Sequence, residues 1–130
     1  MSKCLNIFVG FDQKEAVAYH TFVQSLIENS TIPLSITPLA ENNLYMYTEK
    51  HNDGTNKFTY SRFLIPYLMN FNGWAIFADG DMISTADIKN LKDYFDPRYA
   101  VQVVKHNYKT KYERKYFGQK NEDYPRKNWS

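Results

Sequence analysis

Short apolar runs alternate along this chain with segments that have helical periodicity. The runs at 4–10 (CLNIFVG) and 74–78 (WAIFA) are almost continuously apolar, which is typical of strands buried on both faces of a parallel sheet. The runs at 34–37 (LSIT) and 99–104 (YAVQVV) are also predicted to be strands. This alternation predicts an α/β fold with a mostly parallel sheet and helices on both faces.

Helices are predicted in the segments between these strands. Asp12 is the expected N-cap of the first helix, in which apolar residues recur at helical spacing over 19–27. A second, mostly buried helix is predicted over 58–71, with Pro66 either kinking it or starting its second half. A short third helix is predicted over 86–95.

The length of 130 residues fits one domain with a substantial core. Residues 1–104 are predicted to form its α/β core, and residues 105–130 a basic, tyrosine-rich C-terminal segment of the same domain. The formal net charge is only +2, but this segment holds eight Lys or Arg residues against three Asp or Glu residues. The overall charge therefore does not favour a nucleic-acid partner.

Several other classes of protein are excluded or disfavoured by composition. A single cysteine excludes an internal disulfide, and no apolar stretch approaches the roughly 18 residues of a membrane span. The N-terminus lacks a signal-peptide pattern, so a cytoplasmic protein without a membrane span is predicted. Aromatic and basic residues alternate over 105–120, which leaves nucleic-acid binding as a lesser alternative, although a solvated surface is expected there. The oligomeric state is not predicted.

Two aspartates directly follow the apolar run at 74–78. Asp79 and Asp81 flank Gly80, and the residues Gly10-Phe11-Asp12 follow the first predicted strand. Ligands of open parallel sheets bind at the carboxyl ends of the strands. Two neighbouring carboxylates repel unless a cation lies between them, and Mg²⁺ or Mn²⁺ takes carboxylate and diphosphate oxygens. We therefore expect a metal site at Asp79 and Asp81, with Gly80 leaving room for the ligand.

The D-x-D triplet can also occur without a metal site of this kind. Asp79-Gly80 is a favoured pair for a hairpin turn, and eight aspartates in the chain make a chance triplet common. Haloacid-dehalogenase-like phosphatases also place D-x-D after an apolar strand, but at the start of a longer domain. The chain ends at Ser130, too soon after Asp81 for the later motifs of that class.

A longer block of sequence resembles the family 8-like nucleotide-sugar glycosyltransferases of the GT-A fold. In that family a Thr-x-[Tyr/Phe]-[Ser/Ala]-Arg-[Phe/Leu] helix precedes an apolar strand that ends in D-x-D, and an h-x-x-D-h-x-x-L segment follows. The run at 7–26 is similar to the first strand and helix of the family. The residues of this chain that match the three motifs are Thr59, Ser61, Arg62, Phe63, Asp79, Asp81, Asp87, Ile88 and Leu91.

This resemblance implies a Rossmann-like GT-A nucleotide-diphospho-sugar transferase fold and a residue-level site. Asp79 and Asp81 would bind Mn²⁺ or Mg²⁺, and the other residues would bind the nucleoside-diphosphate sugar. The residues alone also allow a purely structural role for two of them. Asp12 would then serve as a helix cap without binding the nucleotide, and Arg62 would pair with an acid such as Asp79 without binding the donor. The implied donor-binding residues are Gly10, Phe11, Asp12, Arg62, Asp79, Gly80, Lys105 and His106.

The resemblance also implies sugar transfer as the reaction, and it implies that the acceptor-binding half of the family's domain is missing. A metal-dependent glycosyltransferase would transfer the sugar to a glycan, lipid or protein acceptor, with no catalytic residue assigned. Because the family's domain is longer, this chain would be its donor-binding half, truncated at the C-terminus. The segment at 124–130 (YPRKNWS) resembles a motif that leads into a further strand. A module that binds the nucleotide sugar without turnover is the alternative.

Overall fold

A computed structural model describes residues 3–107, 109–114, 118 and 120. The chain divides into two compact units, Met1–Tyr94 and Phe95–Ser130, each of which is described by itself. The predicted boundary between residues 104 and 105 stays a prediction. The motif predicted at 124–130 lies outside the described residues.

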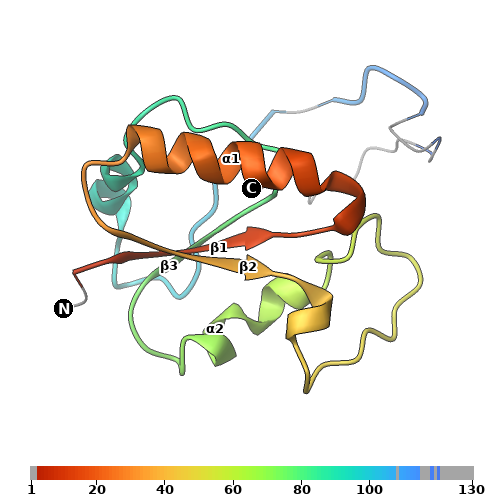
Figure 1. Ribbon diagram of the computed structural model, residues 1–130, viewed down its shortest axis with the longest axis horizontal. Helices are drawn as coiled ribbons and strands as arrows, with labels where there is room; N and C mark the ends of the chain where they lie inside the picture. The colour runs from red at the N-terminus through yellow and green to blue at the C-terminus, as the bar shows by residue number, and fades with distance from the viewer. Residues whose placement is uncertain (1–2, 108, 115–117, 119, 121–130) are drawn as a thin grey trace. The chain divides into compact units, whose positions relative to one another are not determined.

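The first unit contains a parallel three-stranded sheet (Figure 1). The strands are β1 (Leu5–Gly10), β2 (Leu34–Leu39) and β3 (Ala75–Ala78), and their order across the sheet is β2-β1-β3. Both neighbours of β1 run parallel to it. The predicted α/β class with a parallel sheet is therefore confirmed.

Helices cover both faces of this sheet, as predicted. Helix α1 (Ala16–Asn29) follows the 3₁₀ turn η1 (Gln13–Glu15) and lies on one face, and α2 (Ile65–Leu68) lies on the other (Figure 1). The remaining 3₁₀ helices are η2 (Glu41–Asn43), η3 (Ser61–Leu64) and η4 (Ile88–Tyr94).

The core lies in two layers, one on each side of β1. Because side chains alternate along a strand, Ile7 and Val9 project to the face opposite that of Phe8. Phe8 packs with Leu39 and Phe58 in one buried cluster. On α1 the buried apolar side chains are Tyr19, Phe22 and Leu26.

The second predicted helix differs from expectation in length and burial. Pro66 lies in the first turn of α2, and the preceding residues form the separate 3₁₀ helix η3, so this proline starts a second half rather than kinking one long helix. Ile65 and Met69 pack against the core cluster, whereas Phe63 and Tyr67 are exposed. The prediction of a mostly buried helix was wrong because only one side of these short turns meets the sheet.

The fourth predicted strand does not form. Residues 99–104 contain no strand residue, and Val101 is 77% exposed. An apolar run forms a stable strand only when it pairs with a neighbour and buries its side chains, and this run buries none of its side chains. The third predicted helix is present as the 3₁₀ helix η4, which has no buried residue.

No membrane-spanning helix occurs in the described part of the chain, because none of its helices combines enough length with enough apolar character.

Candidate functional site

The carboxyl ends of β1 and β3 lie side by side at the point where the strand order reverses. The chain places β2 on one side of β1 and then returns to place β3 on the other. In open α/β sheets, this switch point is where ligands bind. Val9 pairs with Ala78, so Gly10 and Asp79 follow directly from paired residues. The two acidic strand ends of the sequence are thus neighbours.

Gly80 makes the close approach of these two strand ends possible. A Cβ atom at Gly80 would lie 2.4 Å from the carbonyl oxygen of Gly10. Both partners are fixed parts of the backbone, so a side chain at this position would push the ends of β1 and β3 apart. From the sequence, Gly80 was expected to leave room for a ligand. The structure shows that packing against Gly10 already requires a glycine here, and contact of Gly80 with a ligand stays a prediction.

Gly10 also has a packing reason to be glycine. A Cβ atom there would lie 2.4 to 2.7 Å from three ring atoms of Phe58, which is almost completely buried. The neighbouring Phe11 packs edge-on against the ring of Tyr19, with ring centroids 5.3 Å apart. Both residues thus shape the end of β1, and their predicted contact with a nucleotide stays a prediction.

Asp79 has one enclosed and one accessible side. Its side chain is 46% exposed, yet its Oδ1 atom is buried and has no hydrogen-bond partner among the described residues. Arg62 lies beside it: its Nη2 is 3.3 Å from Oδ1 as an ion pair without hydrogen-bond geometry. Burial raises the pKa of the Asp79 carboxyl, the Arg62 guanidinium opposes this rise, and the Asp81 carboxylate adds to it.

Arg62 is held in place by contacts other than its ion pair with Asp79. Its Nε donates a hydrogen bond of 3.2 Å to the carbonyl oxygen of Phe58. Its guanidinium carbon lies 4.7 Å from the ring centroid of Phe77, a residue of β3. The ion pair between Arg62 and Asp79, which the sequence analysis left as an alternative, is thus present. The Arg62 side chain remains 31% exposed.

Asp79 and Asp81 have the ligand chemistry that a hard divalent cation needs. Asp81 is exposed in the turn that begins at Gly80. In the described part of the chain, no group of three His, Cys, Asp or Glu side chains is close enough to hold a metal. Mg²⁺ is commonly bound by one or two carboxylates together with water and phosphate oxygens, so the pair fits such an ion without a third protein ligand.

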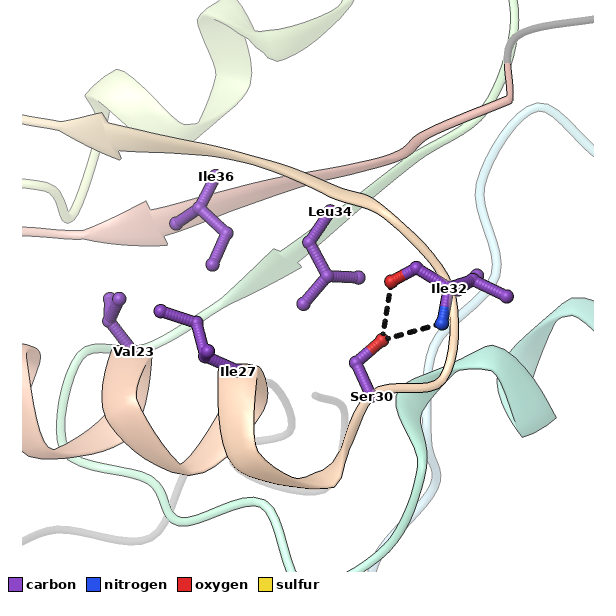
Figure 2. Close-up of a pocket in the computed structure, with 6 residues that line it drawn as sticks. All are labelled: Val23, Ile27, Ser30, Ile32, Leu34 and Ile36. Carbon is purple, nitrogen blue, oxygen red and sulfur yellow. Dashed lines mark hydrogen bonds between the residues drawn. The ribbon is translucent and has the colours of Figure 1, made fainter.

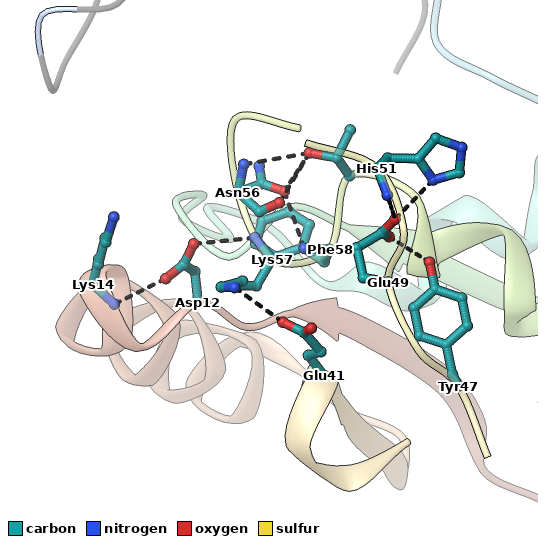
Figure 3. A network of polar contacts seen from close by, with 10 residues as sticks. Asp12, Lys14, Glu41, Tyr47, Glu49, His51, Asn56, Lys57 and Phe58 are labelled. Atoms are coloured by element: carbon teal, nitrogen blue, oxygen red, sulfur yellow. Dashed lines mark hydrogen bonds and ion pairs between the residues drawn. The ribbon is translucent and has the colours of Figure 1, made fainter. Parts of the chain in front are cut away.

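Asp12 caps the first helical turn and also anchors a distant loop (Figure 3). Its Oδ1 accepts a hydrogen bond of 3.0 Å from the backbone N–H of Lys14, and its Oδ2 accepts one of 3.1 Å from the backbone N–H of Lys57. Asp12 is the N-cap of the 3₁₀ turn η1, whereas α1 itself follows Glu15, which makes no capping side-chain hydrogen bond, so the predicted N-cap is confirmed only for the turn that leads into the helix. Because Asp12 is only 9% exposed and both oxygens are engaged, the structure gives it a structural role, and base recognition by this residue stays a prediction.

Replacing Asp12 by alanine is expected to destabilise the protein by about 2 kcal/mol, because two backbone N–H groups lose their acceptor. Asp12→Asn should fall between alanine and the wild type, since an amide offers only one acceptor oxygen. Lys57→Ala is the matched control: it removes the 3.3 Å ion pair to Glu41 but keeps the N–H that Asp12 binds. Urea unfolding measures all three, and a Lys57→Ala effect as large as that of Asp12→Ala would contradict the anchor.

The same loop contains a polar cluster that sequence reasoning missed. Glu49 accepts hydrogen bonds from the Tyr47 hydroxyl and, at 2.6 Å, from the backbone N–H of His51, whose ring Nδ1 lies 2.7 Å away (Figure 3). The His51 ring stacks on Tyr60, with ring centroids 3.9 Å apart. The sequence indicated only a polar loop here, because nothing local distinguishes residues that will pair with one another.

The cluster predicts a pH dependence of the loop. The hydrogen bond from Tyr47, followed by those from His51, lowers the pKa of Glu49 to about 2 from its ordinary 4.5. The ionised carboxylate therefore contributes stability above pH 4.5, and this contribution is lost as the pH falls from 4.5 towards 2. Urea unfolding of the wild type and Glu49→Gln at pH values of about 6, 4 and 3 should show a difference that shrinks with acidity. Tyr47→Phe should weaken this dependence, and equal slopes in all three proteins would refute it.

Asp87, which matches the aspartate of the h-x-x-D-h-x-x-L motif, forms hydrogen bonds that connect two turns. Its Oδ2 accepts hydrogen bonds of 3.0 Å and 2.5 Å from the backbone N–H and hydroxyl of Thr31, and its Oδ1 accepts one of 3.0 Å from the backbone N–H of Lys89. This residue therefore joins the segment after β3 to the turn between α1 and β2. The structure thus gives Asp87 a structural role that needs no ligand.

Lys105 and His106, the remaining predicted donor-binding residues, belong to the second unit and are exposed. Their predicted place beside the sugar stays a prediction.

A surface pocket of about 330 Å³ lies between α1 and the edge strand β2 (Figure 2). None of its lining residues belongs to the carboxylate site. Ser30 closes one end through hydrogen bonds with Ile32. The pocket is lined by Val23, Ile27, Ser30, Ile32, Leu34 and Ile36.

Fold and site together define a small α/β unit with two acidic strand ends at the switch point of its sheet. The chain is 40% identical over 132 residues to Protein CDI of Arabidopsis thaliana, across 98% of this chain and 51% of that protein. It thus spans about half the length of the curated relative that it matches. No family model and no solved structure matches the chain.

These comparisons correct the family assignment. The sequence was expected to belong to the family 8-like glycosyltransferases of the GT-A fold, but the protein that matches nearly the whole chain is named Protein CDI. Neither a family model nor a solved structure lends that assignment support. The assignment was wrong because it rested on short motifs, of which D-x-D occurs often by chance and Asp87 has a structural role.

Proposed function

We propose that this chain binds the diphosphate group of a nucleoside-diphosphate sugar through Mn²⁺ or Mg²⁺ held by Asp79 and Asp81. The observation that carries the proposal is the carboxylate of Asp79: it ends a strand at the switch point, and its buried Oδ1 lacks a hydrogen bond within the described residues. Burying a carboxylate oxygen without a hydrogen bond is costly, and the ion pair with Arg62 offsets only part of this cost, so a cation bound to the carboxylate would stabilise it further.

The neighbouring groups fit the rest of such a ligand. Asp81 offers a second, exposed carboxylate, which suits an ion that keeps part of its water shell. The partly exposed guanidinium of Arg62 can donate hydrogen bonds to phosphate oxygens, which its planar arrangement of N–H groups matches. The proposal requires a Rossmann-like fold in which further strands extend this small sheet.

The reaction that this site would serve is sugar transfer by the whole protein. The bond between the anomeric carbon and the diphosphate oxygen would break, with its electron pair leaving on the diphosphate. An acceptor hydroxyl would form the new bond to the anomeric carbon, and its proton would pass to solvent water. When bound, the divalent cation would neutralise the charge that develops on the diphosphate. No residue of this chain is assigned to the proton transfer.

Calorimetric titration tests the binding. Uridine or guanosine diphosphate with Mn²⁺ should release or absorb heat and raise the melting temperature, because a ligand at a hundredfold excess over its Kd adds about 2.7 kcal/mol of stability. Asp81→Asn should remove both effects, whereas Asp93→Asn, which neutralises an exposed aspartate on η4, should leave them unchanged. The absence of heat and of a melting shift with both nucleotides would refute the proposal.

Binding without turnover is the alternative, and the relative's greater length favours keeping it. The chain spans 51% of that protein, so an acceptor-binding part could lie elsewhere in a longer protein. Incubation with nucleotide sugars separates the two. Release of free sugar or glycosylation of an acceptor would exclude a binding-only module, and binding without either product would exclude turnover by this chain.

A further inference from the structure

Arg62 is a fixed positive charge beside the Asp79 carboxylate that the proposed cation would use. The hydrogen bond from its Nε to Phe58 and the cation–π contact of its guanidinium with the Phe77 ring hold it independently of Asp79. Phe58 is almost completely buried, so its carbonyl belongs to a well-packed part of the unit. The guanidinium therefore cannot move far from Asp79 without losing contacts that have nothing to do with the ion pair.

The Arg62 charge has opposite consequences for a cation and for an anion. Two carboxylates and one guanidinium leave the site with a net negative charge. A divalent cation bound to the accessible side of the Asp79 carboxylate would lie near the Arg62 Nη2, which is 3.3 Å from the buried Oδ1, and the two positive charges would repel. A diphosphate in contact with both the cation and the guanidinium would screen this repulsion. It would also accept hydrogen bonds from the guanidinium N–H groups, which make none to Asp79 Oδ1.

We infer that Arg62 makes the divalent cation and the diphosphate bind cooperatively, by weakening binding of the cation alone and strengthening binding of the two together. Arg62 is thus a positioning residue that favours a preformed metal–diphosphate complex over the free metal. The inference rests on the proposed function.

The experiment is calorimetric titration of Mn²⁺ with and without inorganic pyrophosphate, corrected by blank titrations for the complex that the two form in solution. In the wild type, pyrophosphate should raise the Mn²⁺ affinity by roughly 5- to 150-fold, the usual range for coupled sites. By reciprocity, Mn²⁺ should raise the pyrophosphate affinity by the same factor.

Arg62→Met keeps an apolar stem against Phe77 and removes the charge. It should bind Mn²⁺ alone more tightly than the wild type does, and the coupling factor should fall below the wild-type value, leaving only the part that comes from direct bonds between metal and diphosphate. Arg62→Lys should retain part of the coupling, because it keeps the charge without the guanidinium geometry. Lys92→Met, which removes an exposed charge from η4, is the matched control and should change neither quantity. Thermal melts in the absence of metal verify that each variant is folded.

The outcomes separate this inference from the function that it deepens. Wild-type protein that binds neither Mn²⁺ nor pyrophosphate, together with no response to the nucleotides, would refute the proposed function. Wild-type protein that binds both additively would refute the inference alone. So would weaker binding of Mn²⁺ by Arg62→Met, or full coupling in that variant. If Arg62→Met does not fold, a reduced coupling factor in Arg62→Lys supports the inference, and full wild-type coupling with unchanged Mn²⁺ affinity in that variant overturns it.

Discussion

Gly80→Ala is expected to lower the free energy of unfolding by roughly 2–3 kcal/mol, the upper part of the range for overpacking a core. The added Cβ would lie 2.4 Å from the carbonyl oxygen of Gly10. Carbon and oxygen atoms that are not bonded do not approach this closely, and neither backbone can move without separating the ends of β1 and β3. Since a domain of this size has only about 5–15 kcal/mol of stability, the melting temperature should fall on the order of 10 °C.

Gly54→Ala is the matched control for this substitution. A Cβ atom at Gly54 would approach side-chain atoms of Thr59 no closer than 3.2 Å, and those atoms can shift. Its melting temperature should therefore stay close to that of the wild type. Thermal unfolding followed by circular dichroism measures both variants, and equal effects at Gly80 and Gly54 would show that the two strand ends do not meet as closely as described.

Asp79→Asn is expected to have two effects of opposite sign. Without metal it should raise the melting temperature, because the raised pKa of Asp79 means that its ionised form destabilises the folded state at neutral pH. Loss of the ion pair to Arg62 subtracts little, since both side chains are partly solvent-exposed. With Mn²⁺ and a nucleoside diphosphate, the variant should lose the stabilisation that the wild type gains, because a neutral amide is a poor ligand for a divalent cation.

The sign of the metal-free effect can be checked by pH. A carboxyl whose folded-state pKa is raised contributes its full stability below its ordinary value of 3.8 and loses it as the pH rises through the raised value. The advantage of Asp79→Asn over the wild type should therefore be greatest at about pH 7 and should decrease as the pH is lowered. A variant that is less stable than the wild type at neutral pH, or whose metal response is unchanged, would contradict the account of Asp79.

Local patterns in the sequence predicted most of the first unit. The three strands that form lie within one to two residues of the predicted runs, and Asp12 caps the 3₁₀ turn that leads into α1. Strand and helix periodicity and capping depend on neighbouring residues, so they can be read along the chain. Burial cannot: the run at 74–78 was expected to be buried on both faces, but β3 is an outer strand of the three-stranded sheet and has no fully buried residue. The run at 99–104 carried the same apolar signal and failed, because a strand also needs a partner, and none pairs with it in the described residues.

The candidate site was predicted only in part, for a related reason. The sequence predicted acids at two strand ends, and the order β2-β1-β3 made those ends neighbours. It could not predict that Asp12 would accept a hydrogen bond from the backbone of Lys57, 45 positions away. Nor could it predict that Glu49 would form hydrogen bonds with Tyr47 and His51. From the sequence, Gly80 was also expected to be a glycine in order to leave room for a ligand, whereas in the folded chain the Gly10 carbonyl packs against it.

The amino-acid order by itself determined an α/β unit with a parallel sheet and carboxylates after its first and third strands, because alternating apolar runs and helical segments leave few other ways to bury their faces. Only the tertiary structure decided which of these groups meet. The contacts of Gly80 with Gly10 and of Arg62 with Asp79 join residues that are distant in sequence, and such pairs are fixed by strand order and packing rather than by any local preference.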